Sequence, residues 1–258
     1  MKIPQVLLYI PIAILAACSD TASSNHVTEE NQAQEIVDKS ILAMGGGMLD
    51  HASVTFKFRT RTYAFWQKDG KFKYTRTHVD TLGTSTVDVL TNDGLMRSID
   101  NEEVDLDSTW TQRYSNSVNS VLYFAFLPYR LNDPAVIKTY NGLREINGKS
   151  YHEVEVQFRK EGGGVDHDDN FLYWFDENNF TLDYFAYDYI TGDKGVRFRQ
   201  AINRRKVNGL TVQDYINYKP INKSTDLHGI FEAYKRGELK ELSRIELENV
   251  RVNKLASE

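Results

Sequence analysis

Residues 171–218 read FLYWFDENNFTLDYFAYDYITGDKGVRFRQAINRRKVNGLTVQDYINY, and this stretch decides the fold. It is rich in aromatic and β-branched residues and has almost no helical periodicity, which favours β-strands. Turn signals interrupt it at 176–179, 191–193 and 207–209. The stretch therefore predicts four consecutive antiparallel strands in the middle of a large, curled sheet.

The rest of the chain extends this pattern on both sides. Alternating apolar and polar residues at 54–107 and 135–158, joined by turns such as Asn147-Gly148, predict hairpins in series, and a last strand is predicted over 239–252. Apolar stripes with helical spacing occur at 29–44 and 110–126, while 226–236 predicts a short helix or a partly ordered loop. The expected fold is mainly β (α+β): a curled antiparallel sheet or incomplete β-barrel of about 11–12 strands, with two or three covering helices.

The composition supports a globular β protein and argues against nucleic-acid binding. The 258 residues are 41% hydrophobic, which is sufficient for a packed core, and the formal net charge is -5. A nucleic-acid-binding protein needs a basic face, which this charge balance disfavours. Because no linker follows residue 28, residues 29–258 are expected to form a single β-rich domain.

The N-terminus predicts export and lipid anchoring. Residues 1–17 have a short apolar run behind Lys2, which matches a secretory signal peptide and is too short to span a membrane. The motif Leu15-Ala-Ala-Cys18 resembles the bacterial lipobox, which implies that the chain's only cysteine carries the lipid. Residues 18–28 would then form the lipidated cysteine and a flexible tether to the membrane. Ser19, directly after the cysteine, favours the outer membrane over the inner membrane.

The layout of residues 29–252 resembles the lipoprotein-localisation-factor fold of the LolA/LolB type. An N-terminal helix, a β-meander, an inserted helix and further hairpins carry the resemblance, which implies an incomplete barrel around an apolar cavity for acyl chains. The chain also resembles a family of uncharacterised Gram-negative envelope lipoproteins. Its members sometimes carry a deoxyribose-phosphate aldolase label, but that enzyme is a parallel α/β barrel, which this strand order does not build. The blocks that carry this second resemblance are Asn119–Pro128, Gly162–Asp169, Tyr173–Phe175, Asp183–Tyr187 and Gly195–Arg199.

One loop is a candidate metal site. Asp166, His167, Asp168 and Asp169 follow three glycines, and their carboxylate and imidazole groups suit a divalent cation. Their spacing is not that of an EF-hand, so a solvated acidic loop is the alternative. No other cofactor is expected.

Arginines and aromatic residues on the strands are candidates for ligand binding. Arg197 and Arg199 share one strand face and could bind an anionic headgroup, whereas a solvated face paired with Asp and Glu is the alternative for these and the other strand arginines. The aromatic residues either fill the core or line a ligand cavity. The predicted ligand-binding residues are Phe56, Phe58, Trp66, Tyr74, Trp174, Phe185, Tyr187, Tyr189, Arg197 and Arg199.

These features predict a membrane-anchored envelope lipoprotein that binds a hydrophobic or amphipathic ligand without catalysis. The ligand would be an acyl chain, a lipid or a lipidated partner protein on the concave face of the sheet. The sequence contains no G-x-S-x-G, Walker, H-E-x-x-H or C-x-x-C motif. Two alternatives stay open: an enzyme that uses the Asp166–Asp169 loop on a small envelope substrate, and a structural or partner-binding lipoprotein with a filled core.

Overall fold

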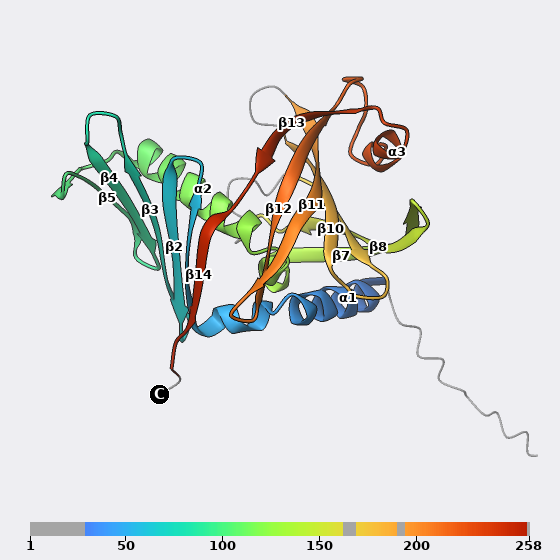
Figure 1. The fold of residues 1–258 in the computed structure, drawn as a ribbon, viewed down its shortest axis with the longest axis horizontal. Helices are drawn as coiled ribbons and strands as arrows, with labels where there is room; N and C mark the ends of the chain where they lie inside the picture. Colours follow the sequence, from blue (N-terminus) through green and yellow to red (C-terminus); the bar gives the residue numbers. More distant parts are fainter. Residues whose placement is uncertain (1–28, 162–168, 190–193, 257–258) are drawn as a thin grey trace, which may run out of the picture.

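The computed structural model describes residues 29–161, 169–189 and 194–256, which form two antiparallel sheets covered by helices (Figure 1). Every strand pairing in these residues is antiparallel, as predicted. The predicted mainly β fold class is confirmed. The described strands number fourteen, slightly more than expected, and they form two sheets of seven strands rather than one.

The first sheet has the order β14-β1-β2-β3-β4-β5-β6, and the second has the order β13-β12-β11-β10-β9-β8-β7. The strands of the first sheet are β1 (Ala52–Phe58), β2 (Arg61–Lys68), β3 (Lys71–Val79), β4 (Ser85–Thr91), β5 (Gly94–Ile99), β6 (Glu102–Glu103) and β14 (Glu248–Lys254). Those of the second are β7 (Val136–Ile146), β8 (Lys149–Phe158), β9 (Phe171–Asp176), β10 (Leu182–Tyr189), β11 (Gly195–Val207), β12 (Leu210–Pro220) and β13 (Leu239–Ile245).

The stretch that decides the fold forms β9 to β12, four neighbouring strands of the second sheet, as predicted. All six residues of β9 are buried, because both faces of the sheet are covered. Phe171, Tyr173 and Phe175 pack in a core with α1 (Glu29–Ala43), whereas Leu172 and Trp174 pack on the opposite face with α3 (Ile230–Lys235). Trp174 stacks on Phe231 of α3 with a centroid distance of 4.7 Å.

The helix α2 (Ser108–Ala125) lies across the first sheet, and its sequence explains both ends. The Asp107 carboxylate accepts a hydrogen bond from the Trp110 backbone N–H at 2.9 Å, so the helix begins two residues before the predicted start. Val118 and Leu122 are buried against the sheet, and Pro128 follows the helix end. Two short 3₁₀ helices, η1 (Gly46–His51) and η2 (Tyr129–Asn132), complete the described helical elements.

The prediction of one strand over 239–252 is wrong, because the chain bends at 246–247 and passes from one sheet to the other. β13 is the edge of the second sheet, and β14 pairs with β1 in the first. Side chains of the second sheet hold the bend: the buried Asp214 carboxylate accepts from the Leu247 N–H at 2.9 Å, and the Arg205 guanidinium donates to the Leu247 carbonyl. Arg205 also pairs with Asp214, at 3.2 Å.

The end of α1 is fixed against the hairpin between β11 and β12. The Thr211 N–H donates to the Met44 carbonyl at 2.9 Å, and Gly45 follows with a φ of 73°. A β-carbon on Gly45 would lie 2.2 Å from the Gly209 carbonyl oxygen, so both the conformation and the close approach require glycine here.

Candidate functional site

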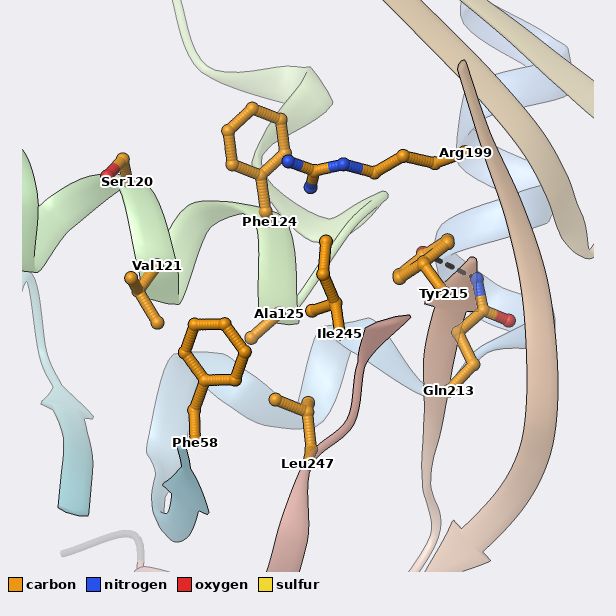
Figure 2. Close-up of a pocket in the computed structure, with 10 residues that line it drawn as sticks. All are labelled: Phe58, Ser120, Val121, Phe124, Ala125, Arg199, Gln213, Tyr215, Ile245 and Leu247. Atoms are coloured by element: carbon orange, nitrogen blue, oxygen red, sulfur yellow. Dashed lines mark hydrogen bonds between the residues drawn. The ribbon is translucent and has the colours of Figure 1, made fainter. Parts of the chain in front are cut away.

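An apolar cleft lies where α2, the end of β1 and the bend between β13 and β14 meet the second sheet (Figure 2). Its volume is about 190 Å³. The apolar residues that line it are Phe58, Val121, Phe124, Ala125, Ile245 and Leu247. The polar residues that line it are Ser120, Arg199, Gln213 and Tyr215.

The cleft exists because α2 contacts the hydrophobic core of the first sheet and also a core of the second sheet. Val118 and Leu122 face the first sheet, while Phe124 packs on the core of the second sheet. Val121, one turn before Ala125, lies between these two contacts and faces the cleft. The bend at 246–247 supplies the facing wall, since it brings Leu247 from the second sheet's edge toward Phe58.

Arg199 gives the cleft a charged end. Its residue surface is 9% exposed, and its Cζ lies 4.6 Å from the ring centroid of Phe124, 5.1 Å from that of Phe185 and 5.3 Å from that of Tyr187. Its Nη2 donates to the Tyr187 hydroxyl at 3.1 Å, but its Nε has no hydrogen-bond partner. Among the described residues no carboxylate pairs with Arg199, so its charge is buried against aromatic rings and one hydroxyl. Figure 2 shows this guanidinium beside Phe124, away from Phe58 and Leu247.

Two further polar groups stand beside Arg199. The Gln213 side-chain amide donates to the Tyr215 hydroxyl at 2.6 Å and to the Leu182 carbonyl at 2.9 Å, which fixes the Tyr215 hydroxyl oxygen (Figure 2). Burial raises the pKa of Tyr215 to about 12, so this hydroxyl is protonated at neutral pH. The cleft therefore offers a guanidinium and a neutral hydroxyl at one end and apolar side chains at the other.

The groups in the lining that could take part in acid–base or nucleophilic chemistry are the hydroxyls of Ser120 and Tyr215. The residues that line the cleft include no carboxylate, imidazole, amine or thiol. Such groups supply general acids, bases and activated nucleophiles in most enzymes. This set of side chains can bind an apolar ligand and a negatively charged or hydrogen-bond-accepting group.

The predicted ligand-binding residues of the second sheet divide between its two faces. Arg199 lines the cleft. Phe185 and Tyr187 of β10 contact the Arg199 guanidinium with their rings. Tyr189 continues the same face, with the Arg197 Cζ 4.8 Å from its ring centroid. Trp174 lies on the opposite face, under α3.

The predicted ligand-binding residues of the first sheet also lie in different parts of the structure. Phe58 lines the cleft, whereas Phe56 and Tyr74 are buried in the core beneath α2. Trp66 lines a separate shallow surface pocket. Three of the other strand arginines pair with carboxylates, as the alternative of a sheet face paired with Asp and Glu predicts. The pairs are Arg76–Asp88, Arg204–Asp183 and Arg205–Asp214.

Two other predicted sites fall wholly or mostly outside the described residues. Cys18, Asp166, His167 and Asp168 lie there, and Asp169 is the only member of the proposed metal loop that is described. Within the described ranges, no group of three or more His, Cys, Asp or Glu side chains is placed to hold a metal ion. The helices described here also include none long and apolar enough to cross a membrane.

The sequence reasoning missed the walls that α2 and the strand bend contribute. Phe124 lies off the apolar stripe predicted for its helix, which consists of Tyr114, Val118, Val121, Leu122 and Ala125. A large apolar residue outside such a stripe indicates a second contact surface. Leu247 falls within the single strand predicted over 239–252, whereas the structure places it at the bend between β13 and β14. Gln213 and Tyr215 occupy alternate positions on β12 and could be recognised only once the sheet topology was known.

The fold and the cleft together define an antiparallel β protein with a small, mainly apolar cleft between two sheets. Within that class, the chain belongs to the Family of unknown function DUF6503, which matches residues 12–247. The predicted membership of a family without an assigned function is thereby confirmed. No curated protein matches the sequence.

Solved structures with a related layout share little sequence with the chain. The LolA superfamily protein NE2245 from Nitrosomonas europaea is 11% identical with a TM-score of 0.48, and the match covers 87% of this chain and 94% of that one. A DUF1329 family protein from Desulfovibrio piger is 12% identical with a TM-score of 0.47, covering 85% and 92% respectively. At these identities and TM-scores, function has to be inferred from the chain's own geometry.

Proposed function

We propose that this protein binds the apolar part of an amphipathic ligand in the cleft, without catalysis. The ligand is an acyl chain, a lipid or the lipid of a lipidated partner. The observation that carries the proposal is the buried guanidinium of Arg199 at one end of an apolar cleft, with no carboxylate partner among the described residues.

The volume of the cleft sets how much of a ligand it can enclose. An apolar cavity of about 150 Å³ takes one benzene molecule, so about 190 Å³ holds a short run of methylene groups. Each buried methylene contributes about 0.8 kcal/mol. A long acyl chain would therefore place only one segment between Val121 and Leu247, and the remainder would extend beyond the cleft.

Arg199 would select for a negatively charged or strongly accepting head. A buried cation is costly unless a hydrogen-bonded anion accompanies it. Arg199 and Tyr215 both line the cleft, and the Arg199 Nε has no hydrogen-bond partner. A carboxylate can accept from a guanidinium and a hydroxyl at once. A fatty carboxylate combines that head with an apolar chain, whereas an uncharged alcohol of equal length offers only the chain.

The N-terminal motif extends the proposal to location. Lipid on Cys18 would anchor an exported chain in the cell envelope, with residues 19–28 as a tether and Ser19 favouring the outer membrane. The domain that begins at residue 29 would then reach ligands close to the membrane surface.

The test is native mass spectrometry of residues 19–258, which keep every described element, followed by organic extraction of the same sample. A bound lipid or fatty acid at one per chain is the supporting result. A ligand-free mass that stays unchanged after incubation with dodecanoate, dodecanol and phospholipid would overturn the proposal. Val121 variants, described below, provide the matched control for binding at this cleft.

A further inference from the structure

A second cavity, remote from the charged end of the cleft, lies between the first sheet and the N-terminal half of α2. Its volume is about 440 Å³. Four arginines line it: Arg61 of β2, Arg76 of β3, Arg97 of β5 and Arg113 of α2. Asp88 is the only carboxylate in this lining, so the cavity carries a formal charge of about +3 in a chain of net charge -5. We call it the basic hollow.

Asp88 organises the floor of the basic hollow. Its Oδ2 accepts from Arg76 Nε at 2.8 Å and from Arg76 Nη2 at 2.6 Å. Its Oδ1 accepts from Arg97 Nε at 2.7 Å, and Oδ2 accepts from Arg97 Nη2 at 3.1 Å. One carboxylate thus holds two guanidinium groups side by side, and it is fully occupied by them.

The two guanidinium groups retain donors that Asp88 does not use. Each arginine carries five N–H groups. Arg76 spends one more on the Ser117 hydroxyl at 2.6 Å, and Arg97 lies flat on Tyr114 with its Cζ 3.3 Å from the ring centroid. These contacts fix the orientation of both guanidinium groups. The N–H groups that they do not use are available to a further acceptor.

Arg61 and Arg113 complete the rim. Both are exposed, and neither forms an ion pair with any carboxylate among the described residues. Thr86 and His78 add a hydroxyl and an imidazole to the lining. Apart from Asp88, the charged groups of the basic hollow are therefore all donors, which suits a ligand that only accepts hydrogen bonds.

We infer that the basic hollow is a binding site for a tetrahedral oxyanion, the phosphate or phosphate ester of a small molecule or headgroup. The negative charge of phosphate balances the unpaired guanidinium groups. Its oxygens can accept hydrogen bonds from several guanidinium groups at once. A planar carboxylate would use only two oxygens. This site is separate from the Arg199 end of the cleft, and it does not depend on an apolar ligand being bound.

The test uses the full chain in an uncharged, phosphorus-free detergent and measures binding of inorganic phosphate and of glycerol 3-phosphate by calorimetry. Neither probe has an apolar chain, so the result is independent of the cleft. The test variant is Arg61→Gln/Arg113→Gln, which removes the rim and leaves the Asp88 network intact. The control is Arg251→Gln/Lys254→Gln, which makes the same charge change on exposed residues of β14.

The expected result is binding that weakens at least tenfold in the rim variant, stays within twofold in the control, and declines as salt is added. Binding of both probes identifies an ester headgroup as a possible source, and binding of the inorganic ion alone identifies a free oxyanion; both results support the site. Absence of binding by either probe, or equal loss in the rim variant and the control, would overturn it.

Discussion

Phe58 and Arg61 face each other directly across β1 and β2, and each lines a different cavity. Directly opposed residues in an antiparallel pair have Cα atoms about 4.5–5.5 Å apart. The apolar cleft and the basic hollow are therefore neighbours on the first sheet, and α2 lines both with residues from successive turns.

Reducing the cleft should block an apolar ligand. Val121→Phe puts a ring into the cleft and is expected to weaken dodecanoate binding at least tenfold, whereas Val121→Ala enlarges the cleft and should leave binding within threefold. Fluorescence displacement or calorimetry measures both variants. Equal affinity in Val121→Phe and in the unaltered chain would place the ligand elsewhere.

Arg199→Met should separate binding from stability. Methionine can keep the contact with Phe124 and Phe185 while removing a buried charge, so the free energy of unfolding should stay the same or rise by up to about 2 kcal/mol. Dodecanoate affinity should decline at least tenfold, and dodecanol affinity should not change. A large loss of stability in urea denaturation would instead assign Arg199 a structural role.

Asp88→Asn should destabilise the first sheet. The substitution leaves the buried Arg76 guanidinium without its counter-charge, and breaking a buried pair of this kind costs about 3 kcal/mol or more. Glu35→Gln breaks the exposed Lys39–Glu35 pair, 2.6 Å apart, and serves as the control, with an expected cost below about 0.5 kcal/mol. Urea denaturation of both variants checks the difference, and equal costs would contradict the network.

His152 should make stability depend on pH. Burial lowers its pKa below the ordinary value, the Lys39 ammonium lowers it further, and the Glu177 and Asp176 carboxylates oppose this only in part. The unfolded chain then binds the proton more readily than the folded chain does, so stability is lost as the pH declines below about 6.5. His152→Gln should show a smaller loss between pH 7.5 and 5.5 in urea denaturation. An identical loss in the variant would show that other groups cause the dependence.

Gly45→Ala should be costly although it adds one methyl group. The residue has a φ of 73°, and the new β-carbon would lie 2.2 Å from the Gly209 carbonyl oxygen, so a loss of more than about 2 kcal/mol is expected. Gly47→Ala is the matched control, because nothing lies within 4 Å of its β-carbon position. Thermal unfolding of the two variants should differ clearly, and similar midpoints would contradict the close approach.

Local patterns predicted most of the fold. The aromatic and β-branched residues of 171–218 indicated the four strands β9 to β12, and the start of the Asp107-capped helix was predicted to within two residues. The bend at 246–247 could not be predicted, because Asp214 and Arg205 produce it from strands distant in sequence. For the candidate site, Phe58 and Arg199 were named in advance, but nothing local indicated which face of the sheet α2 would cover.

The same limit applies to the basic hollow. Its arginines come from three strands and a helix, and their sequence spacing follows no motif. For Arg61 and Arg76, as for the other strand arginines, the sequence left two interpretations open: anion binding and a solvated sheet face paired with Asp and Glu. The pairings of β2 with β3, β3 with β4 and β4 with β5 bring the strand arginines together around Asp88, and α2 adds Arg113.

The route of the chain at 246–247 also determines when the cleft can exist during synthesis. Leu247 forms one wall, and β14 closes the first sheet by pairing Lys254 with Ala52, almost the whole domain away along the chain. Contacts between such distant residues form late, because a long loop must close first. A nascent polypeptide therefore lacks the complete cleft until its final strands have been synthesised and paired.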